Sequence, residues 1–232
     1  MTVILKATGI SKKYKALTNS AVISHCSIEI EKGKTYVIKG KSGSGKTTLL
    51  NILGGIDKPS SGSVYYQGRS FYELSDNEQS RIRNEDFGFI FQSLNLIPEL
   101  TVYENIELPR FFNRSCKISG SDISNIASEI GIGSLLHRKT YQLSGGEQQR
   151  VAIARALITS PNIIFADEPT GSLDASTSKI IAELLTRTVK IREVALVLVT
   201  HEEKIIEEDH IELTINDGKI ETLEEYHGQF GS

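Results

Sequence analysis

The chain has 232 residues, which is enough for one well-packed domain or for one domain with a smaller lobe. Its 39% hydrophobic and 24% charged residues are typical of a folded globular protein and exclude a disordered chain. A formal net charge of -3 provides no basic surface for bulk attraction to nucleic acid, so we expect no nucleic-acid partner.

The sequence also bounds where the protein works. The start, MTVILKATGI, lacks the basic flank and long apolar core of a signal peptide, and no apolar run approaches the roughly 20 residues needed to cross a bilayer. Cys26 and Cys116 have no disulfide or metal spacing, which suits a reducing cytoplasm. We therefore expect a cytoplasmic location; at a membrane, another chain would have to hold the protein there.

Short β-rich runs dominate the first third of the chain. They predict strands at residues 3–5, 22–30 and 35–38, and SSGSVYYQG predicts a turn leading into another strand. After Lys46, TTLLNILGG predicts a helix that stops at a glycine pair. FGFIFQ, at residues 87–92, predicts a short buried strand.

The texture then changes. TVYENIELP, SDISNIASEIGI and GEQQRVAIARALITS predict helices ended by glycine or proline. NIIFADE and VALVLVTH predict strands of a parallel sheet covered on both faces, with STSKIIAELLTRTVK as a helix between them. IELTINDGKIETL predicts a hairpin that turns at Asp217 and Gly218, and the acidic run at residues 202–209 predicts a solvated helix face.

This order of elements predicts an α/β fold in one unit of two lobes. Residues 1–92 and 158–232 are expected to form a nucleotide-binding core lobe, and residues 93–157 an inserted helical lobe.

GKSGSGKTT, at residues 40–48, matches the phosphate-binding pattern G-x-x-x-x-G-K-[ST] between a predicted strand and a predicted helix. The glycines let backbone N–H groups surround phosphate oxygens, while Lys46 places an ammonium by the β- and γ-phosphates and Thr47 offers a hydroxyl to Mg²⁺. The nucleotide-binding residues expected from this loop are Ser42, Gly43, Ser44, Gly45, Lys46, Thr47 and Thr48.

NIIFADEP supplies paired carboxylates at the end of an apolar strand. Asp167 suits a contact to Mg²⁺ through another ligand or a bound water, and Glu168, which points differently, can polarise an attacking water. With the glycine-rich loop, these acids predict an ATP or GTP hydrolase.

A second phosphate device is predicted at LSGGEQQRVAIARAL. If Ser144, Gly145 and Gly146 precede a helix, their free N–H groups and the helix dipole form another cradle for a γ-phosphate. One monomer cannot easily wrap a nucleotide with two cradles on different lobes. Two copies placed head to tail can, and twofold symmetry makes their two sites equivalent.

The same stretch closely resembles the signature of ABC-type ATPases. Further motifs of that family stand in the expected order: Gln92 in FQSLNLIPELT resembles the Q-loop, SLD at residues 172–174 the D-loop, and His201 in VTHEE the H-loop. Tyr14 in SKKYKAL matches the family's adenine-stacking aromatic residue. The resemblance covers nearly the whole chain and implies a P-loop NTPase (RecA-like) core with an N-terminal antiparallel β subdomain and an inserted α-helical subdomain.

The resemblance also implies roles for these residues, with ATP and Mg²⁺ as cofactors. It implies that Tyr14 stacks on adenine, that Thr47, Gln92 and Asp167 hold Mg²⁺, and that Asp174 couples the two sites of a dimer. The catalytic group would be Glu168 as base with His201, Lys46 and Gln92. Ser144, Gly145, Gly146 and Glu147 would contact the nucleotide of the other subunit, with Glu147 standing where many relatives have glutamine.

NILGGIDKPSSG and the stretch from LSDNEQSRIRNEDFGFIFQ to ENIELP resemble the bacterial macrolide-exporter and lipoprotein-release group of this family. That likeness implies an ATP-bound homodimer at the inner face of the cell membrane, attached to an integral-membrane permease with a large extracytoplasmic domain. The permease would dock near residues 94–103 and export peptides, antibiotics or lipoproteins. An ATPase that drives transmembrane signalling, for cell-wall hydrolase control or antibiotic sensing without cargo, remains an open alternative.

Overall fold

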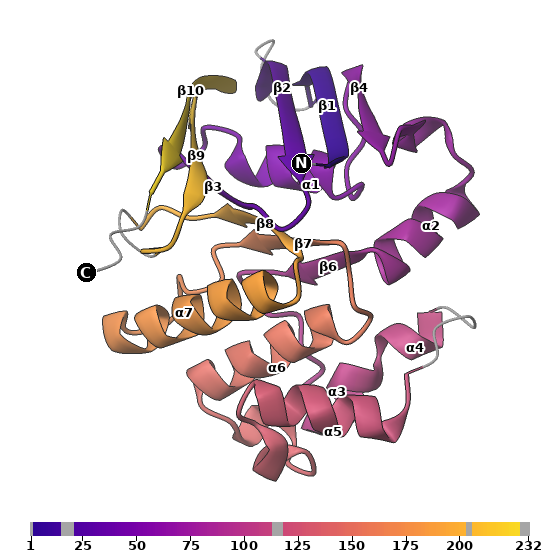
Figure 1. Ribbon diagram of the computed structural model, residues 1–232, viewed down its shortest axis with the longest axis vertical. Helices are drawn as coiled ribbons and strands as arrows, with labels where there is room; N and C mark the ends of the chain where they lie inside the picture. Colours follow the sequence, from indigo (N-terminus) through magenta and orange to yellow (C-terminus); the bar gives the residue numbers. More distant parts are fainter. Residues whose placement is uncertain (1, 15–20, 113–117, 203–205, 228–232) are drawn as a thin grey trace.

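The computed structural model describes residues 2–14, 21–112, 118–202 and 206–227, which fold around two β-sheets (Figure 1). The strands are β1 (Val3–Lys12), β2 (Ile23–Glu31), β3 (Thr35–Lys39), β4 (Ser61–Tyr66), β5 (Arg69–Ser70), β6 (Phe87–Ile90), β7 (Ile163–Asp167), β8 (Ala195–Val199), β9 (His210–Asn216) and β10 (Lys219–Tyr226). The α-helices are α1 (Lys46–Leu53), α2 (Asp76–Glu85), α3 (Val102–Glu107), α4 (Pro109–Phe112), α5 (Gly120–Glu129), α6 (Gly145–Leu157) and α7 (Ala175–Ile191). Short 3₁₀ turns are η1 (Phe71–Glu73), η2 (Gly133–Leu135) and η3 (Thr140–Gln142).

The two sheets have different topologies. A four-stranded antiparallel sheet has the order β2-β1-β4-β5, and a six-stranded sheet has the order β10-β9-β3-β8-β7-β6. Strands β9, β3, β8, β7 and β6 run parallel, while β10 folds back antiparallel on β9. At the predicted hairpin turn Asp217 and Gly218 have φ values of 45° and 74°, the left-handed geometry of a two-residue hairpin. The predicted α/β fold class is confirmed.

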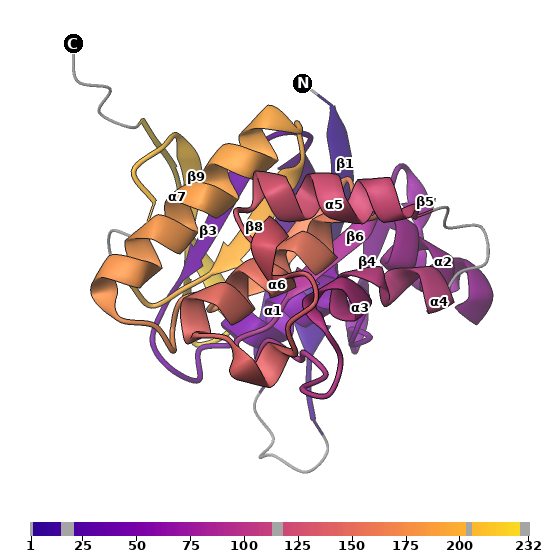
Figure 2. The ribbon, with the colours of Figure 1, turned by 90° about the horizontal axis from the view of Figure 1, so that it is seen from below.

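The parallel sheet is apolar on both faces because successive side chains alternate. On one face Ile163, Phe165 and Val197 pack with α1 and the antiparallel sheet. On the other, Ile164, Ala166 and Leu196 pack with the apolar sides of α6, α7 and the helices of the inserted segment. Figure 1 shows this layering, with α6 and α7 beneath the sheet and α1 above it, and Figure 2 shows α5, α6 and α7 from below. This arrangement leaves the carboxyl ends of the parallel strands free to carry a site.

Four helices begin at a reciprocal capping box, in which an N-cap hydroxyl and an acidic side chain three residues later satisfy each other's backbone N–H groups. The caps are Ser75, Thr101, Ser119 and Ser144. Helix α2 was not predicted from the sequence, since Ile82 is its one buried residue, yet its S-x-x-E cap was a readable signal. Among the described residues, no helix has the length and apolarity that a membrane crossing requires.

The acidic run at residues 202–209 differs from its prediction. Its described residues 202 and 206–209 are not helical, and Ile206 is buried against the core instead of facing solvent. Residues 203–205 and Cys116 lie outside the described residues.

Candidate functional site

The glycine-rich loop connects the end of β3 to the first residue of α1, as its pattern predicted. Gly40 has a φ of 149°, and a Cβ there would lie 2.2 Å from the carbonyl oxygen of Ile215. Gly45, the N-cap of α1, has a φ of 103°, and its Cβ would lie 2.6 Å from the carbonyl oxygen of Val22. Only glycine fits both positions, and the tight loop therefore depends on them.

Lys46 opens α1 and is only 7% exposed. Its Nζ donates hydrogen bonds to the carbonyl oxygens of Gly40 at 2.8 Å and Lys41 at 3.0 Å. The ammonium is therefore folded back over the loop, where it places a positive charge beside the helix N-terminus.

Two carboxylates at the end of β7 approach this loop. Asp167 ends β7, and its Oδ1 accepts a hydrogen bond of 3.1 Å from Thr47 Oγ1. Burial, together with the charge of Glu168, raises the pKa of Asp167 despite the Thr47 hydrogen bond and the Lys46 charge. Glu168 has a φ of 45°, and its Oε1 lies 3.2 Å from Nδ1 of His201, which follows β8.

A cavity of about 610 Å³ joins these groups. Its lining residues are Val22, Ser42, Gly43, Gly45, Lys46, Thr47, Thr48, Glu168 and His201. All but Val22 were predicted from the sequence. Val22 was missed because an apolar residue before a strand carries no chemical signal.

Gln92 lies at the edge of this group. A Cβ added to Gly171 would lie 3.3 Å from Oε2 of Glu168 and 3.6 Å from Nε2 of Gln92, so both side chains approach the same small residue. The structure thereby brings Gln92 beside Glu168, although the two are 76 residues apart in the chain.

Tyr14 follows β1, and its hydroxyl donates a 2.6 Å hydrogen bond to Oδ2 of Asp57. Sequence reasoning missed Asp57, which has no motif of its own in NILGGIDKPSSG.

The signature segment has the predicted form, a Ser-Gly-Gly turn that opens helix α6. Ser144 is the N-cap, and Oε2 of Glu147 accepts hydrogen bonds from the Ser144 backbone N–H at 2.8 Å and from its hydroxyl at 2.9 Å. These two bonds lower the pKa of Glu147. The helix N-terminus thus already holds an anion, the chain's own carboxylate.

The N-terminus of α6 packs against the start of α7. A Cβ on Gly146 would lie 2.8 Å from Cγ2 of Thr177, and one on Gly145 would lie 3.2 Å from Cδ2 of Leu173. Asp174 is the N-cap of α7 and accepts hydrogen bonds from the backbone N–H groups of Ser176 and Thr177, both at 3.1 Å. The hydroxyls of Ser176 and Thr177 also donate to Asp174. Together these bonds hold the pKa of Asp174 far below its ordinary value. The signature and the D-loop-like segment therefore form one surface.

That surface is separate from the cavity. Of the described residues that line the cavity, none belongs to residues 144–147 or is Asp174. The two segments that the sequence predicts to bind phosphate therefore do not face the same space.

A strand, a glycine-rich loop and a helix, set beside an acidic strand end, define a P-loop ATPase. The protein-family model described as ABC transporter matches residues 23–171. Lipoprotein-releasing system ATP-binding proteins LolD from Shewanella oneidensis and Francisella tularensis subsp. holarctica are 40% and 42% identical over 224 residues each. The alignments cover 96% and 95% of this chain and 97% of each relative. The chain belongs to the ABC transporter family and is one of its ATP-binding ATPases.

Solved structures agree. The dimeric structure of MJ0796, described as a bacterial ABC transporter cassette, superposes with a TM-score of 0.85 at 37% identity, covering 97% of this chain and 100% of that one. A post-hydrolysis dimer of MJ0796 bound to ADP and phosphate gives the same TM-score at 36% identity, covering 97% of this chain and 100% of that one. The likeness extends over both sheets and the inserted helices.

Proposed function

We propose that the chain is the ATP-hydrolysing subunit of an export machine and works as a homodimer closed by ATP. The observation that carries this proposal is the separation of the signature cradle at Ser144 from the cavity that holds Lys46 and Glu168. A second copy, related by a twofold axis, would bring its cradle over that cavity and complete two equivalent sites. The dimers solved for MJ0796 support this arrangement.

Within each site the residues divide the work. Tyr14 would stack on adenine, and the loop of residues 42–48 would bind the phosphates through its backbone N–H groups. Lys46 would shift its ammonium from the carbonyl oxygens of Gly40 and Lys41 to the β- and γ-phosphates. Glu168 would take the proton of the attacking water, and His201, 3.2 Å from Glu168, would contact the γ-phosphate.

The signature residues would act across the dimer. The γ-phosphate of the partner's ATP would replace the Glu147 carboxylate at the N-terminus of α6, because both are anions that accept the same Ser144 hydrogen bonds. Asp174, on the same surface as Gly145 and Gly146, would link the two sites.

The oxygen atoms near the loop fit Mg²⁺, which prefers carboxylate, hydroxyl and amide oxygens. Thr47 Oγ1 and Asp167 Oδ1 already lie 3.1 Å apart, and Gln92 approaches Glu168, the residue after Asp167, over Gly171. These three residues would hold the ion, which would neutralise phosphate charge and favour the ionised form of the partly buried Asp167 carboxyl.

The membrane component would be another chain, as the likeness to the ATP-binding proteins of a lipoprotein-releasing system suggests. The LolD relatives are named as ATP-binding proteins of a lipoprotein-releasing system, so extraction of lipoproteins is the export reaction we favour over peptides or antibiotics. We propose that a permease with a large extracytoplasmic domain holds the ATPase at the cytoplasmic face of the membrane.

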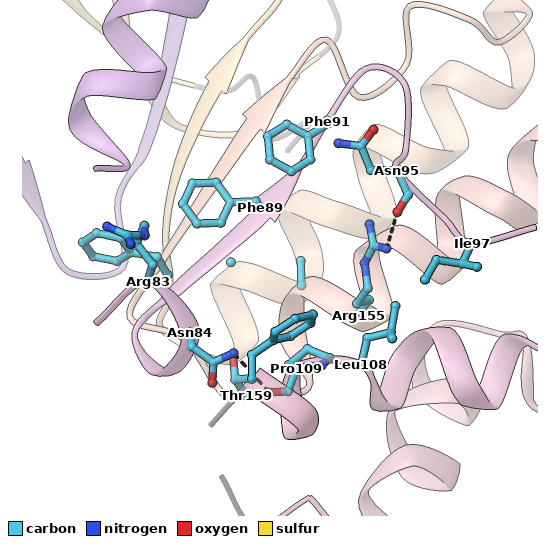
Figure 3. A pocket seen from close by; sticks show the side chains of 14 residues that line it. Arg83, Asn84, Phe89, Phe91, Asn95, Ile97, Leu108, Pro109, Arg155 and Thr159 are labelled. Atoms are coloured by element: carbon cyan, nitrogen blue, oxygen red, sulfur yellow. Dashed lines mark hydrogen bonds between the residues drawn. The ribbon is translucent and has the colours of Figure 1, made fainter. Parts of the chain in front are cut away.

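A groove between the lobes offers a docking site for that permease (Figure 3). Its volume is about 380 Å³, and its walls come from β6, helices α2, α4 and α6, and the segment that follows Gln92. Aromatic and aliphatic side chains dominate the lining, which comprises Arg83, Asn84, Phe87, Gly88, Phe89, Phe91, Asn95, Ile97, Leu108, Pro109, Phe112, Arg155, Ala156 and Thr159. An apolar groove edged by arginine suits a short amphipathic helix of the permease.

Within the docking region expected at residues 94–103, two adjacent side chains differ in their surroundings. Ile97 lines the groove and is 40% exposed, whereas Leu96 packs against the hydrophobic core. Ile97, and not Leu96, is therefore the residue through which this segment would meet the permease.

The dimer is tested with Glu168→Gln, which would bind ATP without hydrolysing it. With ATP and Mg²⁺, size-exclusion chromatography should show a dimer that disappears with ADP. Adding Ser144→Arg to Glu168→Gln should return the protein to a monomer that still binds ATP. A strictly monomeric Glu168→Gln protein at saturating ATP would contradict the proposal.

A further inference from the structure

The surroundings of Tyr14 contain a group that no motif assigns. Both oxygens of the Asp57 carboxylate are engaged there: Oδ2 accepts the Tyr14 hydroxyl at 2.6 Å, and Oδ1 forms an ion pair with Lys12. The Lys12 ammonium also lies 4.8 Å from the centre of the Tyr14 ring, within cation–π range. One carboxylate thus holds the far end of the ring and the cation beside it.

Asp57 is itself fixed to the helix that follows the phosphate loop. Its backbone N–H donates to the carbonyl oxygen of Asn51, in α1, at 3.2 Å. The hydroxyl of Tyr72 donates to the carbonyl oxygens of Asp57 at 2.7 Å and Ile52 at 2.6 Å, tying Asp57 to the end of α1 a second time. Burial raises the pKa of Tyr72, so this hydroxyl keeps its proton. The position of Asp57 is therefore set by α1.

The hydroxyl end of Tyr14 is partly buried against Asp57. Burial and the hydrogen bond to Asp57 raise the pKa of Tyr14, and the neighbouring side chain of Thr48, which lines the cavity, opposes that rise. Independently of the ring, the Lys13 backbone N–H donates to Ser60 Oγ at 3.0 Å, which holds the end of β1 to the loop after Asp57. Loss of the Asp57 carboxylate would therefore free the ring without releasing the strand.

We propose that Asp57, with Lys12, is a positioning residue for the nucleotide base, fixing the Tyr14 ring relative to helix α1 so that base and triphosphate are bound in one preset geometry. This inference rests on the proposed stacking of Tyr14 on adenine. A ring that is held by its hydroxyl and by a cation over its face has less rotational freedom to lose when a base stacks on it. Immobilising one such side chain is worth a factor of roughly three to ten in affinity.

The test compares ATP with inorganic tripolyphosphate, which has the phosphates but no base. Equilibrium binding is measured for the native protein and for Asp57→Ala, Asp57→Asn, Tyr14→Phe and Tyr14→Ala. We expect Asp57→Ala and Tyr14→Phe, which remove the two ends of the same hydrogen bond, to weaken ATP binding about three- to tenfold. Binding of tripolyphosphate should not change. Asp57→Asn keeps an acceptor for the hydroxyl and should restore part of the affinity.

Each other outcome is decisive. Equal loss of ATP and tripolyphosphate binding would show a general structural role and overturn the inference. If Tyr14→Ala weakens ATP binding but Asp57→Ala and Tyr14→Phe do not, stacking holds and the anchoring role of Asp57 is wrong. If Tyr14→Ala also leaves ATP binding unchanged, the proposed adenine contact itself fails. Should Asp57→Ala not fold, Tyr14→Phe, which removes one oxygen, still tests the same bond.

Discussion

His201 Nδ1 lies 3.2 Å from Oε1 of Glu168, across the ends of the neighbouring parallel strands β8 and β7. Glu168 reaches this position through a left-handed backbone, with a φ of 45°, and its backbone N–H donates to the carbonyl oxygen of Val199 at 2.9 Å. The main chain of β8 thus fixes the backbone of Glu168 independently of the histidine.

This arrangement separates two effects on hydrolysis. Glu168→Gln removes the proton acceptor and should lower the hydrolysis rate by about 10²- to 10⁴-fold while ATP still binds. His201→Ala should cause a smaller loss, because the Val199 hydrogen bond keeps Glu168 in place. Phosphate release under saturating ATP measures both, with ATP binding as the control. A Glu168→Gln protein that hydrolyses ATP at the native rate would remove Glu168 from its proposed role.

The ionised form of Asp167 should lower the folding stability of the protein when no nucleotide is bound. Burial raises its pKa, so the folded state holds the proton more tightly than the unfolded state, and folding stability falls as the pH rises from the ordinary pKa through the raised one. Asp167→Asn keeps an acceptor for Thr47 and should raise the melting temperature above this range, with no difference from the native protein in more acidic solution. Differential scanning calorimetry over a pH series tests the sign. A lower melting temperature for Asp167→Asn at neutral pH would contradict it.

Arg155 should hold the turn that follows Gln92. Its guanidinium donates to the carbonyl oxygens of Leu94 and Asn95, both at 2.6 Å, and Figure 3 shows the bond to Asn95. Burial lowers the pKa of Arg155. Leu94 and Asn95 have φ values of 58° and 48°, a conformation that costs a leucine free energy. Arg155→Met should therefore lower the free energy of unfolding by about 2 kcal/mol, and Arg155→Lys by less.

Urea denaturation at equal m-values measures this change. If Arg155→Met has the same free energy of unfolding as the native protein, the two hydrogen bonds from Arg155 to the carbonyl oxygens do not stabilise the turn.

A charge placed in the groove should prevent the permease from docking. Ile97→Asp places a charge on its apolar wall, while hydrogen bonds between the Ile97 backbone and Asn105, at 2.9 Å and 3.0 Å, keep the segment in place. Basal ATP hydrolysis should stay unchanged, whereas stimulation by the proposed permease should be lost. The matched control is Ile191→Asp on α7, an isoleucine that is 68% exposed and does not line the groove. Full stimulation of Ile97→Asp would rule out docking at this wall.

The parts of the site that were readable in the sequence are local. The loop at residues 40–48 lies between its own strand and helix, and Asp167 and Glu168 end an apolar strand, so their neighbours in sequence already define their geometry. The Ser144 turn was readable for the same reason. The hydrogen bonds that Glu147 accepts from Ser144 could not be predicted, because they depend on the side-chain conformation of one residue.

What could not be read depends on contacts between distant segments. Asp57 meets Tyr14 only because the antiparallel sheet brings the end of β1 beside the loop after α1, 43 residues away. Leu96 and Ile97 are adjacent and similar in the sequence, yet Leu96 packs against the core and Ile97 lines the groove. Helix α2 has too few apolar residues for periodicity to reveal it, although its capping box was visible.

The most direct test of the shared site mixes two inactive variants. Lys46→Ala removes the ammonium of the glycine-rich loop. Ser144→Arg blocks the proposed phosphate cradle of the signature segment. In a mixed dimer one site combines both defects, and the other combines an intact loop with an intact cradle. An equimolar mixture should regain hydrolysis that neither variant shows alone, because each mixed dimer has one intact site out of two. A mixture as inactive as its components, or native hydrolysis by Ser144→Arg alone, would contradict a catalytic site built from two chains.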